Sequence, residues 1–470
     1  MMVYTSSSIA SLNGQGARQQ EKIITQEARS AQSDRSPEGM IIRQAVGEIV
    51  EQIRECVFNY MPPSTFREYY LWGLDSHNVY HDAWLQLTGV KQTVQFAARV
   101  MGAQFEPKLF LQLARFVAPM NHYLTFEVIS DNLALGLAEY LPHDSTFFLR
   151  AHLMHDFNVA VCNGLKGDGR DAHEVLSVNE SLARRISTFR QSLSPLKHGA
   201  LADAYLNHTR YVPMDDIEYS LYPLLLANFE AATHLARHSE SLVTGPIIRR
   251  GLYRRYHSAD RLLIDPNLSM GQVVNVSTYA ILIMPVVAYY LEGVASTIGL
   301  RDKLPSIVQD GSLFKALYHA ALLIRLLNDL GTGVVKQESD DRMMMLQDLY
   351  SHSRDMRSDT LTGFLRDVSD QYGARLTRIA KDVKYGEFNI ALYNLRNGAP
   401  FDYSFGVFGE RLEYFSLLYR QKYARMQQHL DIMAQRLGDD TLSNLIERSV
   451  IFHERLYDNV YTQERGEYAI

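Results

Sequence analysis

Cysteine is nearly missing from this sequence. Only Cys56 and Cys162 occur among 470 residues, and neither lies in a Cys-x-x-Cys or Cys/His pattern, which argues against a disulfide framework and a structural zinc site. An excess of positive charge is also missing, because the net charge is −6. A basic surface for nucleic acid is therefore not expected. We predict a chain that works in the reducing cytoplasm, without a nucleic-acid partner.

Long apolar segments are missing as well. The most apolar stretch, Val276–Tyr290, is interrupted by Pro285 and is shorter than the roughly 20 residues that a membrane-spanning helix needs. The amino terminus has neither the basic start nor the apolar core of a signal peptide. It is rich in Ser, Gln and charged residues, with almost nothing apolar to bury. We predict disorder over residues 1–40 and no stable membrane insertion.

Helical periodicity dominates the rest of the chain, and runs of alternating β-branched residues are scarce. Apolar residues recur three and four positions apart, which is typical of amphipathic helices. The long predicted helices include Met270–Ser296, Ser312–Asp329, Thr360–Tyr385 and Phe408–Arg436. These patterns predict an all-α protein with one large core, in which residues 41–120 form an N-terminal helical layer and residues 121–470 form the main domain.

The stretch "LLIRLLNDLGTGVVKQESDD", residues 322–341, ends a nearly apolar helix with Asn328 and Asp329. A buried carboxylate needs a cation, an Arg or water, so Asp329 should meet one. Thr332 follows Asn328 by one helical turn, on the same face. Amide, hydroxyl and carboxylate oxygens together suit Mg²⁺. The alternative is a helix that simply stops at Gly-Thr-Gly and is followed by a solvated acidic face.

This stretch also resembles a sequence motif of a known protein family. "NDLGT" resembles the first half of the second metal motif of class I terpene synthases, in which Asn, then Ser or Thr four residues later, then Glu four residues further on bind Mg²⁺. Asn328 and Thr332 match, whereas Lys336 stands at the Glu position. The nearest carboxylate is Glu338, two residues late, and a bulge at the two glycines would have to bring it back. The resemblance implies a single large helical bundle of this family, with residues 121–470 as its catalytic domain and an N-terminal extension.

The family carries an aspartate-rich motif on an earlier helix that faces the second motif. The segment "FFLRAHLMHDFNVAVCNG", residues 147–164, offers His155, Asp156 and Asn158, with Asp168 and Asp171 in the loop that follows. The resemblance implies that Asp156 binds metal and acts in catalysis together with Asn328 and Asp329.

A competing acidic start occurs in "MDDIEYS", which contains Asp215, Asp216 and Glu218. These acids stand at the beginning of a predicted helix, where the helix dipole favours them and where Asp215 is a natural cap.

Several basic and aromatic residues are candidates for substrate binding. Arg325 lies one turn before Asn328 in an apolar helix and needs an anionic partner, a carboxylate or a diphosphate. Arg250 and Arg254 lie four apart on one face, where they converge on a phosphate or form a solvated face. The segment 270–294 resembles the family's broken helix, without its Arg. The full predicted set is Arg325, Arg254, Arg255, Asn275, Tyr279, Tyr289 and Phe157.

The resemblance implies a terpene cyclase with Mg²⁺ as its cofactor. Such an enzyme ionises a linear prenyl diphosphate, folds and cyclises the carbocation in an apolar, aromatic pocket, and releases diphosphate. The partner is then a small molecule, and a homodimer is left open.

Two other functions fit the same sequence. Glu230 and His234 lie four apart, close to the Glu/His spacing of di-iron carboxylate proteins. A haem-oxygenase-like non-haem di-iron oxidase would draw its ligands from these two residues and from His122, Glu127, His152, His155 and Asp156. A non-catalytic helical interaction protein is favoured if Arg325, Asn328 and Asp329 only satisfy one another.

Overall fold

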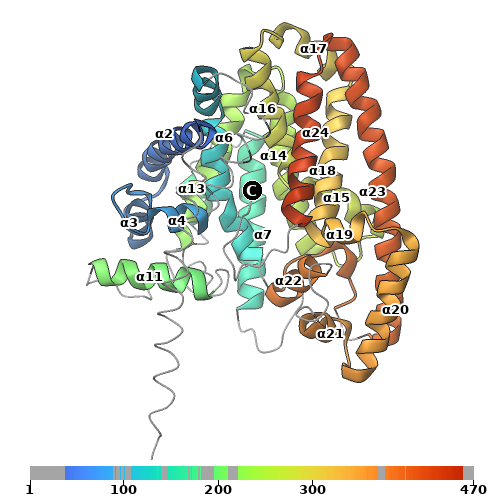
Figure 1. The fold of residues 1–470 in the computed structure, drawn as a ribbon. Helices are drawn as coiled ribbons and strands as arrows, with labels where there is room; N and C mark the ends of the chain where they lie inside the picture. The colour runs from blue at the N-terminus through green and yellow to red at the C-terminus, as the bar shows by residue number, and fades with distance from the viewer. Residues whose placement is uncertain are drawn as a thin grey trace, which may run out of the picture.

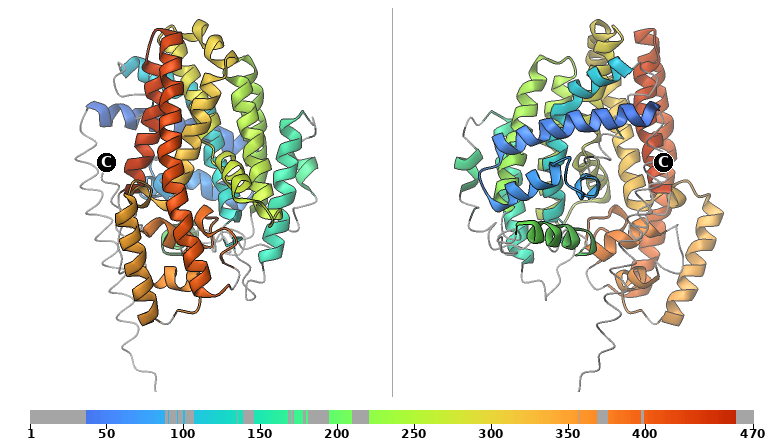
Figure 2. Two further views of the ribbon diagram at one scale, coloured as in Figure 1. Left: turned by 90° about the vertical axis from the view of Figure 1, so that its right-hand side faces the viewer. Right: turned by 60° about the vertical axis from the view of Figure 1, so that its left-hand side comes forward.

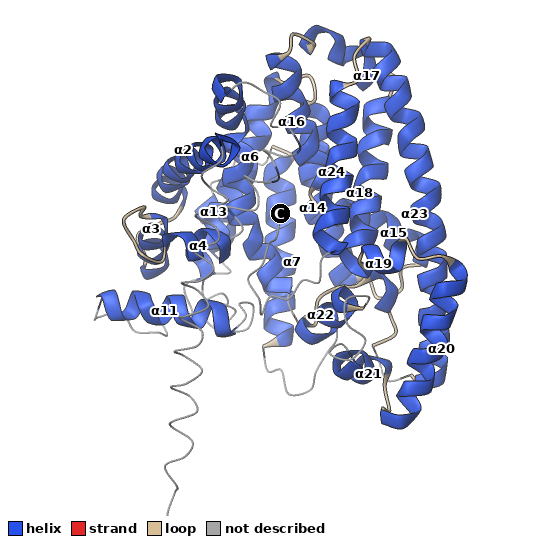
Figure 3. Cartoon of the chain, viewed as in Figure 1, coloured by secondary structure: helices blue, strands red, loops and turns tan. Residues whose placement is uncertain are grey.

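The computed structural model describes residues 37–87, 90, 96, 100, 107–134, 136–138, 146–167, 170, 172–177, 180, 195–209, 221–356, 358–368, 376–396 and 399–458. Every regular element in these ranges is a helix (Figure 3). The all-α prediction is therefore confirmed for the described chain. Most of the stretch predicted to be disordered, residues 1–36, lies outside the described residues. The same holds for five acidic residues of the sequence analysis, Asp168, Asp171, Asp215, Asp216 and Glu218.

The N-terminal helices form one side of the molecule (Figure 1). They are α2 (Pro37–Tyr60), α3 (Thr65–Leu74) and α4 (His81–Leu87). Helix α2 packs against α6 (Pro107–Ala134) and α13 (Leu221–His238). Because α6 runs through residue 120, the predicted N-terminal layer and the main domain share one continuous helix.

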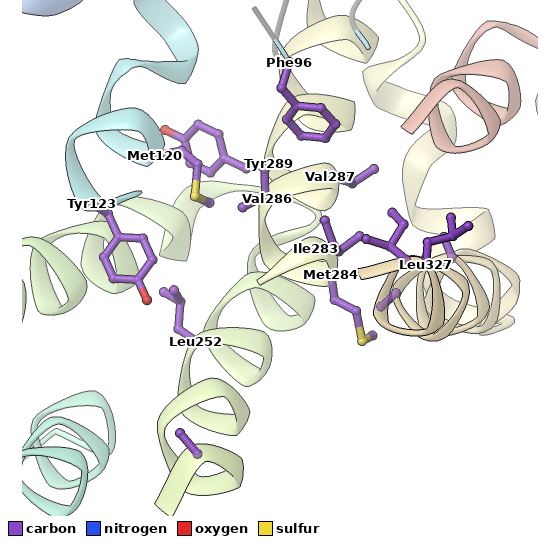
Figure 4. Close-up of a cluster of buried hydrophobic side chains, with 14 of the residues drawn as sticks. Phe96, Met120, Tyr123, Leu252, Ile283, Met284, Val286, Val287, Tyr289 and Leu327 are labelled. Carbon is purple, nitrogen blue, oxygen red and sulfur yellow. The ribbon is translucent and has the colours of Figure 1, made fainter. Parts of the chain in front are cut away.

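The middle of the molecule contains α6, α13, α7 (Phe147–Leu165), α14 (Gly245–Ile264) and α16 (Ile283–Thr297). Helix α14 packs against α7, α15 (Met270–Ala280) and α16. Apolar side chains from several of these helices meet in the interior, among them Met120, Leu252, Ile283 and Tyr289 (Figure 4). Two short helices, α8 (Ala172–Leu176) and α11 (Pro195–Thr209), lie between α7 and α13 in the sequence.

Periodicity predicts one helix over Met270–Ser296, but the chain breaks at Ile281 and Leu282 into α15 and α16. Pro285 explains the position, because it has no N–H to donate to the carbonyl of Ile281. The two helices meet at an angle of 41°. In the described part of the chain, no single helix is both long enough and apolar enough to cross a bilayer. Within the same residues, the bent pair α15 and α16 has the necessary length and composition only when the two helices are taken together.

The C-terminal helices form the other side of the molecule. Helix α18 (Ser312–Leu330) packs against α16, α23 (Phe401–Leu437) and α24 (Thr441–Asp458), and the left view of Figure 2 shows this layer from its outer side. Below it lie other helices of the region (Figure 1). These are α19 (Thr332–Val335), α20 (Ser339–Met356), α21 (Leu361–Val368) and α22 (Thr377–Tyr385), whereas α17 (Leu304–Gln309) precedes α18.

Two features of this side differ from the sequence prediction. The predicted helix Thr360–Tyr385 is two helices, α21 and α22. Helix α20 was missed because most of its side chains are polar and few are buried. Its one deeply buried charge, Arg342, bonds to Glu413 of α23 through Nε at 3.0 Å.

Candidate functional site at the carboxyl end of the central helix

The central helix α18 ends where the sequence predicts. Gly331 adopts φ +81° and ψ 155°, a backbone conformation that almost only glycine occupies, and its N–H closes the last turn on Leu327 O at 2.9 Å. Helix α19 starts directly afterwards at Thr332. Asn328, Asp329 and Thr332 therefore stand on either side of a sharp break.

Gly331→Ala should lower the free energy of unfolding by about 1–3 kcal/mol, because an L side chain is strained at this φ. Gly271→Ala is the matched control, since Gly271 is exposed on α15 with open space around it. Its free energy of unfolding should stay constant or rise by up to about 1 kcal/mol. Urea unfolding of both variants measures the difference. Equal free energies of unfolding for the two variants would mean that a side chain at position 331 causes no strain.

Asp329 is fully buried, and protein groups occupy both of its carboxylate oxygens. Oδ1 pairs with the Arg325 guanidinium and accepts from Asn328 Nδ2 at 3.2 Å. Oδ2 accepts from the backbone N–H of Ile390 at 2.9 Å. The predicted cation partner of Asp329 is thus Arg325, and the predicted anionic partner of Arg325 is a carboxylate of its own helix.

Asn328 and Thr332 also bond to protein groups. Arg378 of α22 donates to the Asn328 backbone oxygen through Nε and to Oδ1 through Nη2, both at 2.8 Å. Its guanidinium lies 4.8 Å from the ring centre of Tyr457. Thr332 donates to the backbone oxygen of Glu454 in α24 at 2.6 Å. These contacts fix the end of α18 between α22 and α24.

Asp382 of α22 is a buried carboxylate that the sequence analysis did not single out. Asn389 Nδ2 donates both to Asp382 Oδ2 and to the backbone oxygen of Asp329, each at 2.8 Å. Asp382 Oδ1 has no hydrogen-bond partner among the described residues. Burial raises the pKa of Asp382 to about 6, although the nearby Arg378 opposes the shift. Two carboxylates therefore share this end of the bundle.

The raised pKa of Asp382 predicts a pH dependence of stability. The ordinary value is 3.8 and the folded value is about 6, so the folded state binds the proton more tightly. The stabilisation from protonation is complete below about pH 4 and is lost as the pH rises through 6. Between pH 4 and 7 the wild type should lose about 2 kcal/mol more than Asp382→Asn. Urea unfolding across this range tests the prediction, and Asp367→Asn, at an exposed position of α21, is the control. Parallel wild-type and Asp382→Asn curves of unfolding free energy against pH would contradict it.

A third helix end reaches the same place. Gly136, two residues after α6, donates to Tyr385 O at 3.0 Å, and Ala138 donates to Gly386 O at 3.1 Å. A Cβ on Gly386, where φ is +61°, would stand 2.7 Å from Gly136 Cα, so only glycine permits this approach. Helix α22 thus runs from the end of α18 to the end of α6. The last turn of α6 carries the sequence Ser-Asp-Asn at 130–132.

Glu338 lies apart from Asn328. Its side chain is 74% exposed and pairs with Arg420 of α23 at 3.1 Å. Because Thr332 is bonded to Glu454 and Glu338 faces solvent, the predicted metal ligands Asn328, Thr332 and Glu338 do not converge in this arrangement. The guanidinium of Arg378 on Asn328 Oδ1 places a positive charge there, which opposes a metal ion at the same oxygen.

Asp156 lies in α7, half-exposed, and pairs with His152 at 3.3 Å. Helix α7 packs mainly against α13 and α14, and α18 mainly against α23 and α24. The next residue, Phe157, is fully buried with its ring 6.0 Å from that of Tyr256.

Three of the predicted substrate residues do gather, on the face shared by α14, α15 and α18. The Arg254 guanidinium lies 5.3 Å from the Tyr279 ring centre, and Tyr279 meets the Tyr318 ring at 5.6 Å. Tyr318 donates to Asn275 Oδ1 at 3.1 Å. Arg250 is 5.2 Å from the ring of Phe314, so each of the two arginines lies against a different ring.

The other predicted substrate residues are buried elsewhere. Arg255 pairs with buried Glu127, its Nε 2.7 Å and its Nη2 2.6 Å from Glu127 Oε1. Tyr289 is fully buried with its ring 5.2 Å from that of Phe116.

Comparisons with known proteins do not identify the chain. No family model, curated protein or solved structure matches it. The site must therefore be interpreted from its own residues and from the motif resemblance.

Several of the residues that the di-iron hypothesis needs are engaged with other protein groups. Glu127 pairs with Arg255, and His155 Nδ1 bonds to Asp260 at 2.7 Å. His234 is exposed, with its ring 6.2 Å from that of Tyr60. Within the described ranges, no group of three or more His, Cys, Asp or Glu side chains is arranged to hold a metal ion.

Proposed function

We propose that this chain is a terpene cyclase of the class I type, which ionises a linear prenyl diphosphate and cyclises the carbocation. The observation that carries the proposal is the meeting of three helix ends. Helix α22 connects the Asn-Asp end of α18 to the acid-bearing end of α6 through bonds at Asn328 and Gly136. The resemblance at Asn328, Asp329 and Thr332 supports the same assignment.

The charges at this end suit a diphosphate. Arg325 and Arg378 lie at the end of α18, and Lys381 follows on α22, paired with Glu387 at 3.2 Å. Guanidinium groups bind phosphate oxygens through two parallel N–H donors. In this structure, Arg325 donates to Asp329 and Arg378 donates to Asn328. Binding of a diphosphate would exchange such protein contacts for contacts with the substrate.

The interior of the bundle suits the hydrocarbon part. Phe157, Tyr256, Tyr289 and Tyr290 are fully buried, and Figure 4 shows Tyr289 among Met, Val and Ile side chains of the core. Aromatic faces stabilise a carbocation through their quadrupole, and an apolar interior keeps water away from it.

Mg²⁺ enters the proposal through the resemblance. Bound beside the diphosphate, it would neutralise the charge of the leaving group. Asn328 Oδ1 and the carboxylates of Asp329 and Asp382 are the oxygen donors at this end. Arg378 on Asn328 and Arg325 on Asp329 oppose a metal ion by their positive charge, so these contacts should open when the ion binds.

The test is incubation of the purified protein with C10, C15 and C20 prenyl diphosphates and Mg²⁺, with mass spectrometry of the organic extract and metal analysis of the protein. Cyclic hydrocarbons or alcohols that vanish with EDTA are the expected result. Absence of product with all three chain lengths would contradict the proposal, and stoichiometric iron with oxygen consumption would favour the oxidase instead.

One observation favours a second candidate, a helical protein without catalysis. Arg325, Asn328 and Asp329 bond to one another and to neighbouring helices, which is what a purely structural role requires. This candidate predicts no product and no metal in the same assay.

A further inference from the structure

Two buried asparagines lie in the middle of the bundle, in helices whose inner faces are otherwise mostly apolar. Asn158 of α7 and Asn228 of α13 are fully buried. Among the described residues, neither amide atom of Asn158 has a hydrogen-bond partner, and Nδ2 of Asn228 has none. Neither residue takes part in the contacts at the end of α18.

A chain of hydroxyl groups ends on one of these amides. Tyr123 donates to the Tyr256 hydroxyl at 3.1 Å, and Tyr256 donates to Asn228 Oδ1 at 2.9 Å. All three side chains are buried. Because both hydroxyl protons are engaged, the one hydrogen-bond donor that this chain of groups leaves is the Asn228 amide N–H₂.

Asn158 lies at the level of this chain. Helices α7 and α14 run antiparallel, with His155 Nδ1 bonded to Asp260 at 2.7 Å and Cys162 Sγ bonded to Tyr253 O at 3.8 Å. Interpolating between these two contacts places residue 158 opposite residue 257, one position from Tyr256. The neighbouring Phe157 ring, 6.0 Å from the Tyr256 ring, agrees with this register.

A buried amide without a hydrogen-bond partner destabilises the fold, so a bound partner for Asn158 and Asn228 is the expected explanation. Asn228 offers a donor, and Asn158 offers a donor and an acceptor. A hydroxyl-type oxygen satisfies both, because it accepts from the amides and donates to Asn158 Oδ1. A bound ion is disfavoured, because the nearby charges of Arg255 and Glu127 are already paired.

We propose that α7, α13 and α14 enclose a binding site for one hydroxyl oxygen, held by the side chains of Asn158 and Asn228. The oxygen belongs either to a water molecule or to the alcohol group of an apolar ligand. The site does not depend on the proposed cyclase activity, because the groups that form it are separate from Asn328 and Asp329.

The test combines a high-resolution crystal structure with thermal unfolding of the wild type, Asn158→Leu and Asn228→Leu. An oxygen atom within hydrogen-bond distance of Asn158 and of Asn228 Nδ2 is expected in the wild type. If the source is a ligand, C10 or C15 prenyl alcohols should raise the unfolding temperature of the wild type by about 2–4 °C and that of Asn158→Leu by less than half as much. If the source is water, the oxygen is present without alcohol and the prenyl alcohols cause no shift.

The overturning result is a dry cavity or direct contact between the two amides, together with no shift by the alcohols. Both wild-type readouts stand even if a leucine variant fails to fold. Neither the oxygen atom in the crystal structure nor the shift of the unfolding temperature depends on cyclase activity. Failure of the proposed function would therefore be seen separately, in the prenyl diphosphate assay.

Discussion

Asp329→Leu should lower the free energy of unfolding by about 3–5 kcal/mol at neutral pH. The substitution leaves the largely buried Arg325 guanidinium without its carboxylate and removes the acceptor of the Ile390 N–H. Because the Asp329 side chain has no exposure to solvent, water cannot replace it cheaply. Urea unfolding followed by circular dichroism measures the loss.

The control for this experiment is Glu338→Ala, nine residues away. Its partner Arg420 is 43% exposed and Glu338 is 74% exposed, so breaking this pair should cost less than about 1 kcal/mol. The double variant Arg325→Leu with Asp329→Leu should regain much of the lost stability, because no unpaired charge remains. Equal losses for Asp329→Leu and Glu338→Ala would show that the buried pair is not a determinant of the fold.

Asn328→Ala should reduce the turnover of prenyl diphosphates by about 100-fold or more while the protein stays folded. The loss is of the size found when one preorganised polar group that stabilises developing charge is removed. Folding should persist because Arg378 keeps its bond to the Asn328 backbone oxygen and its contact with the Tyr457 ring. Diphosphate release, measured with the most active chain length, gives the rate.

Asn444→Ala on the exposed face of α24 is the matched control and should leave the rate unchanged. The free energy of unfolding of Asn328→Ala should stay within about 1.5 kcal/mol of the wild type, as expected for a lost hydrogen bond. Turnover within threefold of the wild type would contradict a role for Asn328 in the chemistry.

The fold class and the central helix could be predicted because they rest on local signals. Apolar spacing predicts α18, and glycine at 331 predicts its end. Burial alone also predicts that Asp329 meets a cation, an Arg or water, and the structure pairs it with Arg325. Each of these inferences uses residues that lie within a few turns of one another.

The more distant partners of Asn328 and Asp329 could not be predicted, because they come from residues about 50–60 positions later. Arg378 and Asp382 belong to α22, a helix of nine residues, and Asn389 lies in the loop that follows. Their spacing fits a solvated helix face as well as a buried one. The approach of α22 to α6 depends on two glycines that are 250 residues apart, Gly136 and Gly386, which no periodicity reveals.

The first acidic motif illustrates the same limit. The sequence directs attention to α7 and Asp156, because acids and Asn follow an apolar helix there. The helix that reaches α22, however, is α6, whose last turn contains Asp131. Periodicity gives the extent of a helix but not which end meets which neighbour, and the assignment of Asp156 stays a prediction.

Calorimetric titration with inorganic diphosphate and Mg²⁺ tests the site at the end of α18 most directly. The wild type should bind diphosphate in a Mg²⁺-dependent manner, and Asn328→Ala should weaken the binding at least tenfold, whereas Asn444→Ala should not. Absence of binding to the wild type, or equal binding by Asn328→Ala, would contradict the proposal and leave the Asn-Asp end of α18 as a structural joint between α22 and α24.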